Sequence, residues 1–210
     1  MNMPRPWSSS DWRRRLVQDL EPLLKSDDLT AEISRHQGVP FALFAYPPTD
    51  ERVLRRELSL LRTRVENETV RKVTVFSMAD LVMDAIRAVY GDGGLAHLAE
   101  MERSYAHLKT KERLDLLRGQ IESILSEHYP VPAVLKKQMT TLDPQASVVF
   151  ITRIGRLYPF FRASALLENL MYEVQVPTIL FYPGTRGAGR NTLRFMDSLE
   201  AVHSYRHRIF

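Results

Sequence analysis

Among the side chains that could do chemistry, arginine carries the net charge of the C-terminal part of this chain of 210 residues. From residue 150 onward there are eight arginines, no lysine and four acidic residues, so this segment carries the whole net charge of +4. The planar guanidinium makes bidentate contacts with carboxylates and phosphates, which a lysine ammonium does not. The bias therefore predicts specific contacts made by arginine rather than a general requirement for solubility.

Polar and aromatic residues follow the predicted strands at the ends where the chain leaves them. After two of these strands come Arg153, Arg156, Tyr158, Tyr182 and Thr185. In open α/β sheets the functional crevice lies beyond the carboxyl ends of the strands, so we expect these side chains at one edge of the sheet. A similar Tyr-Pro pair at 46–47 is interpreted as a strand terminator, because proline cannot donate to the hydrogen-bond ladder.

The segment 184–190 (GTRGAGR) is the part of the chain closest to a phosphate-binding loop. Its glycines would let backbone N–H groups approach an anion, which Arg186 and Arg190 could pair with. The segment lacks the lysine followed by Ser or Thr of a P-loop, so a flexible surface loop is the favoured interpretation and an anion site the alternative. The first strand is followed by PPTDE (47–51), whose prolines lack N–H donors, which argues against ATP or dinucleotide binding.

Other familiar catalytic patterns are missing from the sequence. There is no cysteine, which excludes disulfides, thiolate zinc sites and cysteine nucleophiles and favours a reducing compartment. The six histidines form no HExxH motif, and no GxSxG marks a nucleophile elbow. No apolar run approaches the length of about 18 residues that a membrane span needs. We therefore expect a cytoplasmic protein without catalytic residues, metal, cofactor or membrane contact.

Short apolar segments predict the strands that position these loops. They are 41–46, 73–76, 147–152 and 177–182, with a short final strand at 208–210. Helical patterns precede or follow them at 8–25, 49–65, 77–89 and 159–172. Continuously apolar strands linked by helices are typical of sheets buried on both faces. The prediction is an α/β fold, a three-layer, doubly wound and mostly parallel sheet.

Between residues 92 and 143 the pattern changes to consecutive helices. Apolar side chains recur there every three or four residues within a charged surround, at Leu114, Leu117, Ile121 and Ile124. This spacing predicts a helical insertion, 92–143, within a single domain that spans residues 1–210.

Three C-terminal segments carry a recognisable family pattern. They are FITRIGRLYPFFRASALLENL (150–170), VPTILFYPGTRGAGRNTLRFM (176–196) and HSYRHRIF (203–210). They closely resemble the BrxB family of the bacteriophage exclusion (BREX) defence systems, and FALFAYPPTDE (41–51) also looks like that family. The resemblance implies a small non-catalytic component that works beside the alkaline-phosphatase-like protein PglZ, the large ATPase BrxC and the DNA methyltransferase PglX. It assigns no catalytic residue.

The leading hypothesis is an interaction subunit of a BREX complex that docks to PglZ, with BrxC and PglX as further candidate partners. Arginine and tyrosine dominate binding hot spots, so they supply most of the candidate contact residues. These are Arg153, Arg156, Tyr158, Arg162, Tyr182, Thr185, Arg186, Arg190 and Arg194. Two alternatives stay open: a DNA-binding module, favoured by the arginine excess, and a degenerate nucleotide-binding domain, favoured by topology alone. Weak non-specific DNA contact and homodimerisation also stay open.

Overall fold

The structure of the chain is a computed structural model that describes residues 11–35, 38–161, 163–170, 173–186, 193–196 and 208–210. Six strands form its sheet in the order β2-β3-β4-β1-β6, with β5 paired to β4 beside this path. Their bounds are β1 Phe41–Tyr46, β2 Lys72–Ser77, β3 Ser147–Thr152, β4 Thr178–Arg186, β5 Leu193–Phe195 and β6 Arg208–Ile209. All pairs along the path are parallel, which confirms the predicted α/β class.

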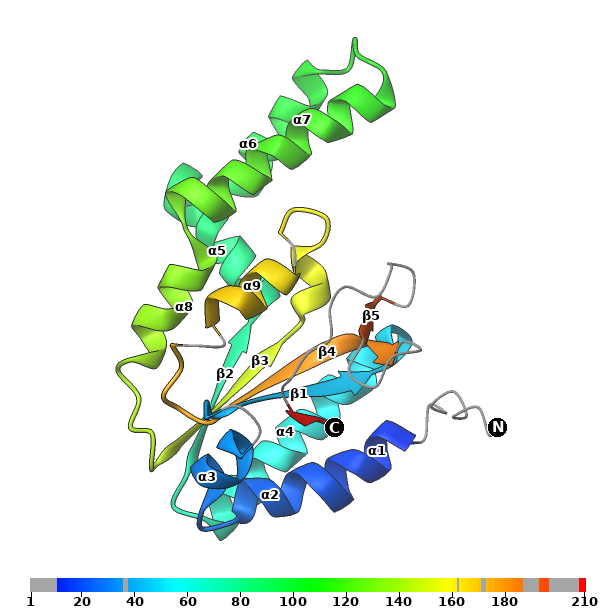
Figure 1. The fold of residues 1–210 in the computed structure, drawn as a ribbon. Helices are drawn as coiled ribbons and strands as arrows, with labels where there is room; N and C mark the ends of the chain where they lie inside the picture. Colours follow the sequence, from blue (N-terminus) through cyan, green and yellow to red (C-terminus); the bar gives the residue numbers. More distant parts are fainter. Residues whose placement is uncertain (1–10, 36–37, 162, 171–172, 187–192, 197–207) are drawn as a thin grey trace.

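One face of the sheet is covered by the N-terminal helices and by the helix that follows β1 (Figure 1). These are α1 Asp11–Arg15, the π-helical turn η1 Leu16–Leu20, α2 Glu21–Lys25, α3 Leu29–Ser34 and α4 Glu51–Glu68, which the 3-10 turn η2 Pro48–Asp50 precedes. Trp12 and Leu61 are fully buried here against the sheet side chains Phe44, Phe150 and Phe181. The apolar spacing of α4 therefore directs one stripe of the helix onto the sheet.

The opposite face is covered by helices that follow β2 and β3. These are α5 Met78–Tyr90, the π-helical turn η3 Ile124–His128, α8 Val131–Met139, the 3-10 turn η4 Ile154–Leu157 and α9 Ala163–Leu170. Ser77 caps α5 as its spacing predicts, since its hydroxyl accepts from the Asp80 N–H at 3.4 Å. With Leu43 and Leu180 buried on this face, the sheet lies between two helical layers, and the three-layer prediction is confirmed.

Two helices of the predicted insertion project away from the sheet as a hairpin (Figure 1). They are α6 Gly94–Ser104 and α7 Thr110–Ser123, whereas η3 and α8 return to the core. α7 contains no buried residue, and Leu114 is 57% exposed. The predicted apolar stripe thus reaches the core only at its carboxyl end, where Ile121 packs against the core and Ile124 is buried in it, because the hairpin extends beyond the layer that could cover the rest of it.

The hairpin of β4 and β5 differs from the prediction. β4 continues to Arg186, so residues 184–186 of the predicted surface loop are strand, and residues 187–190 lie outside the described residues. β5 pairs antiparallel with this extension. Gly184 has φ of 157°, and a Cβ there would overlap the backbone carbonyl of Arg194. Glycine therefore permits the close approach of the two strands.

The expectation that every strand is buried on both faces is wrong for β2. This strand lies at the edge of the sheet, and its Val75 is 42% exposed. An apolar run of strand length indicates a strand but not its place in the sheet. The strand order, which is a tertiary property, decides that β2 has one neighbour and partial cover.

Candidate functional site

The strand order places a crevice at the carboxyl edge of the sheet. The chain leaves β1 towards α4 on one face and leaves β3 towards η4 and α9 on the other, so the loops diverge between these strands. Such a reversal is where α/β sheets bind ligands or partners. A cleft of about 280 Å³ lies there, lined by Pro48, Glu51, Arg153, Gly155, Arg156, Pro183 and Met196.

Arg153 is the central residue of this edge. It follows β3 directly and has a left-handed backbone conformation, with φ of 58°. An Nη1 atom of its guanidinium lies 3.4 Å from Asp80 Oδ1 and 3.4 Å from Ser77 Oγ. Both contacts are at the long end of the hydrogen-bond range, and the Asp80 side chain is 72% exposed. The guanidinium is thus directed by weak, exchangeable contacts.

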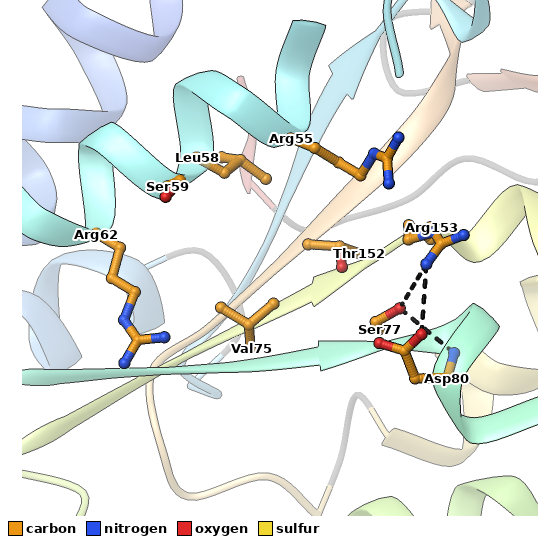
Figure 2. A pocket seen from close by; sticks show the side chains of 9 residues that line it. All are labelled: Arg55, Leu58, Ser59, Arg62, Val75, Ser77, Asp80, Thr152 and Arg153. Atoms are coloured by element: carbon orange, nitrogen blue, oxygen red, sulfur yellow. Dashed lines mark hydrogen bonds and ion pairs between the residues drawn. The ribbon is translucent and has the colours of Figure 1, made fainter. Parts of the chain in front are cut away.

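A second cleft of about 310 Å³ adjoins the first at Arg153 (Figure 2). It is lined by Arg55, Leu58, Ser59 and Arg62 of α4, Val75 and Ser77 of β2, and Asp80, Thr152 and Arg153. The cleft follows from the path of α4, which begins after β1 and ends beside the start of β2. There Glu66 accepts the Val73 N–H at 3.0 Å. The carboxyl half of β2 is consequently left without a helix on this face.

The second cleft is positively charged. Among the described residues that line it, three are arginines and one, Asp80, is acidic. Arg62 Nε pairs with Glu66 Oε1 at 3.2 Å, whereas Arg55 has no ion pair within the described part of the chain. The hydrogen bond from the Val73 N–H is the main cause of the lowered pKa of Glu66, and the positive charge of Arg62 lowers it further. Burial acts in the opposite direction. Glu66 is therefore held charged beside Arg62, while Arg55 stays open to an incoming anion.

The loop after β1 is held rigidly beside the first cleft. Tyr46 is fully buried and donates its hydroxyl hydrogen to Glu51 Oε2, and burial raises the pKa of this phenol above its ordinary value. Trp12 Nε1 donates to Asp50 Oδ2 at 2.6 Å, which connects the N-terminal helix to the same loop. β1 ends at Tyr46, immediately before Pro47, in agreement with the interpretation of this Tyr-Pro pair as a strand terminator.

The structure separates the candidate contact residues into several groups. Arg153 and Arg156 lie together in the first cleft, with Arg156 exposed. Tyr158 is 49% exposed and lines a different groove of about 520 Å³ between α7 and the loop before α9, beside Phe160 and Phe161. The strand-end position alone did not distinguish these two surfaces.

The remaining candidates lie in or beyond the β4–β5 hairpin. Tyr182 is only 3% exposed, and the centroid of its ring lies 5.4 Å from that of the Phe195 ring. It therefore belongs to the core. Thr185 pairs in register with the exposed Arg194. Arg186 is the last residue of β4. Arg162 and Arg190 lie outside the described residues.

Sequence reasoning missed the arginines of α4. Arg55 and Arg62 are seven residues apart, which is close to two helical turns, and therefore share one side of the helix. That spacing was a usable signal. It did not indicate that this side of α4 borders the same cleft as Arg153, because the crossing of α4 over the sheet is set by the strand order.

Neither a metal-binding group of side chains nor a membrane-spanning helix is found among the described residues. In that part of the chain no three His, Asp or Glu side chains are grouped so that they could hold a metal ion. None of its helices combines the length and the apolar character needed to cross a membrane.

Comparison with known proteins agrees with the sequence pattern. No solved structure matches the chain. The BREX protein BrxB of Bacillus cereus (strain H3081.97) is 23% identical over 176 residues, which cover 82% of this chain and 86% of that relative. The family model for BREX protein BrxB matches residues 74–209, from β2 through the C-terminal strand. The match spans well over half of the chain, which therefore belongs to the BrxB family of BREX proteins.

Proposed function

We propose that this BrxB-family protein is a non-catalytic interaction subunit of a BREX defence complex, acting in the cytoplasm. It docks to the phosphatase-like PglZ component, with BrxC and PglX as further partners. The observation that carries the proposal is the cleft at the carboxyl edge of the sheet, where Arg153 and the exposed Arg156 lie beside Met196. Arginine and methionine are enriched at protein interfaces, and arginine recurs among binding hot spots.

The cleft resembles a docking surface more than a catalytic pocket. Its walls combine prolines, a methionine that is 37% exposed and Glu51, whose carboxylate accepts from Tyr46, with two guanidinium groups that can pair with carboxylates of a partner. The sequence contains no P-loop lysine through which a nucleotide phosphate would be held. Binding of an acidic partner surface therefore explains the residue types better than phosphoryl transfer does.

The test is a binding titration of the full chain against purified PglZ, with Arg156→Glu as the variant. Arg35→Glu is the matched control, because Arg35 is also exposed but lies before β1, at the opposite edge of the sheet. We expect Arg156→Glu to weaken docking by about 2 kcal/mol, roughly thirtyfold in Kd, without lowering the melting temperature. Equal binding by both variants would place the docking surface elsewhere. Failure of the unmodified chain to bind PglZ, BrxC or PglX would overturn the proposed function.

A further inference from the structure

Strand β2 presents an open edge beside the second cleft. It pairs with β3 over its six residues, and no second strand lies next to it among the described residues. It contains no proline, and its Val75 side chain is 42% exposed. Proteins usually protect such edges, because unpaired backbone groups are a template for pairing with another chain.

The backbone of β2 is directed alternately towards β3 and away from it. The Lys72 N–H donates to the Ala146 carbonyl before β3, and the next amide, of Val73, donates to Glu66 Oε1. By this alternation the amides of Val75 and Ser77 are also directed away from β3. Glu66 thus covers the first outward amide, while those at the carboxyl half border the cleft.

Positive charge borders this open half of the strand. Arg55 and Arg62 extend from α4 above Val75, and Arg153 closes the end of the cleft (Figure 2). Arg62 has Glu66 and Arg153 has Asp80 as an ion-pair partner, but Arg55 has none within the described residues. A strand added to β2 would place every second side chain on the face that α4 borders. Acidic side chains at those positions would meet the guanidinium groups.

We propose that the edge of β2 accepts an extended acidic segment of a partner protein as an added strand. Main-chain hydrogen bonds to β2 supply its affinity, and pairing of alternate carboxylates with Arg55 and Arg62 supplies its specificity. The inference rests on the proposed function only in that the chain acts by binding proteins. It concerns a surface other than the docking cleft around Arg156.

The residues of the cleft favour this occupant over two others. A second copy of the chain would bring another set of arginines to the same edge, and like charges oppose that pairing. Single-stranded nucleic acid is bound through aromatic side chains on which bases stack, and no aromatic residue is among the described residues that line this cleft. An acidic strand satisfies both the open backbone and the excess charge.

The experiment measures fluorescence anisotropy of the full chain with labelled peptides of about ten residues. One peptide alternates glutamate with threonine, a second alternates lysine with threonine, and a third is the glutamate peptide with all of its backbone nitrogens methylated. We expect the lysine peptide not to bind and N-methylation to weaken binding by about tenfold or more, since it removes main-chain donors. Equal binding of the methylated and unmethylated peptides would overturn strand addition.

Variants of the chain locate the peptide. Arg55→Ala should weaken binding of the glutamate peptide by about tenfold, and Arg56→Ala, exposed on the same helix but outside the cleft, should leave it unchanged. Val75→Pro removes an amide that is directed away from β3 and leaves the hydrogen bonds to β3 in place, as is allowed in an edge strand. It should abolish binding of the glutamate peptide, and Val75→Ala is its control. Unchanged binding by a folded Val75→Pro protein would overturn the proposal. If that variant melts early, the methylated peptide decides the question on the unmodified chain.

A further comparison distinguishes this proposal from its alternatives and from the proposed function. Displacement of the peptide by a thymidine oligonucleotide, with oligonucleotide binding unaffected by Val75→Pro, would indicate a phosphate site and overturn the acidic strand. If PglZ binds the chain but the glutamate peptide does not, the edge proposal fails and the proposed function stands. If the peptide binds while PglZ, BrxC and PglX do not, the proposed function fails and the edge proposal stands.

Discussion

At the scale of single residues, Arg153 lines both clefts. Its backbone has a left-handed conformation, which is unfavourable for any residue with a Cβ. A side chain with φ of 58° is strained by about 1 kcal/mol relative to glycine, and such strain often marks functional positions. The ion pair with Asp80 is long and exposed, so it contributes little to stability. These two features leave the guanidinium available for contacts outside the chain.

Replacement of Arg153 by glycine should therefore not lower the melting temperature. Glycine adopts the left-handed conformation without a Cβ penalty, whereas alanine retains that penalty, so Arg153→Gly should be more stable than Arg153→Ala by about 1 kcal/mol. Thermal melts of the two variants and the unmodified chain measure this difference. An Arg153→Gly protein less stable than Arg153→Ala would show that the left-handed conformation carries no strain.

Glu21 helps to fix the position of α4, the helix that carries Arg55 and Arg62. Arg64 of α4 makes two hydrogen bonds to this carboxylate, at 2.7 and 2.8 Å, and Lys25 makes a third at 2.7 Å. Arg64 above all, and then Lys25, lower the pKa of Glu21 although its burial acts in the opposite direction. The cluster connects α2 to α4 and so fixes the helix from which Arg55 and Arg62 extend.

The lowered pKa of Glu21 predicts that part of the free energy of unfolding is lost in acid. A carboxyl group with a lowered pKa in the folded chain stabilises it above the unfolded pKa of about 4.3, and the contribution is lost as pH falls through the folded pKa. Glu21→Gln should reduce the free energy of unfolding by about 2 kcal/mol at neutral pH and flatten its decline below about pH 4.5. Urea melts across pH provide the measurement. An identical pH dependence in the variant would contradict the assignment.

At the scale of elements, the β4–β5 hairpin supports the first cleft, at the carboxyl edge of the sheet. Gly184 of β4 pairs in register with Phe195 of β5. Met196, which directly follows β5, lines the cleft. The Met196 N–H donates to the Pro183 carbonyl at 2.9 Å, which holds this side chain beside Gly155. Displacement of β5 would therefore change one wall of the cleft.

Gly184→Ala is the change that tests this connection. Its Cβ would meet the Arg194 carbonyl at a φ that alanine rarely adopts, so we expect a loss of about 1–3 kcal/mol of stability and faster amide exchange in β5. Hydrogen exchange read by mass spectrometry measures the effect, with Gly119→Ala as control because space around Gly119 is open. Unchanged protection of β5 would show that the two strands do not require glycine.

At the scale of the whole molecule, Arg153, Arg156 and Arg194 lie at the carboxyl edge of the sheet in an α/β fold that hosts many unrelated functions. We expect no ATP hydrolysis and no nuclease activity by the purified chain with magnesium or manganese, because the sequence has no P-loop lysine. Turnover is measured against a preparation carrying both Arg153→Ala and Arg194→Ala. Activity well above that preparation would contradict the non-catalytic proposal.

The same charge distribution sets an expectation for DNA. If the arginines serve protein contacts, duplex DNA should bind no tighter than about 10⁻⁴ to 10⁻⁶ M at physiological salt, the range of non-specific binding. Affinity should also fall steeply as salt increases, because counterion release drives such binding. Anisotropy across a salt series is the measurement. A nanomolar complex that discriminates between sequences would favour the DNA-binding alternative.

Local pattern by itself determined β1, β3, the cap of α5 and part of the candidate site. The bounds of β1 and β3 coincide with their predicted segments, because a short, continuously apolar run without helical period is typical of a strand covered on both faces. Ser77 caps α5 as predicted, since a cap depends on a spacing of three residues. Arg153 and Arg156 were predicted at one edge because parallel strands end together.

Only the tertiary structure decided which distant residues face one another. The apolar run of β2 is as typical of a central strand as those of β1 and β3, yet the strand order places it at an edge beside Arg55 and Arg62. Pairing of β5 with β4 likewise depends on an approach at Gly184 that no periodicity reveals. Spacing along the chain reports contacts within an element, whereas the path of a helix across a sheet depends on the packing of every layer at once.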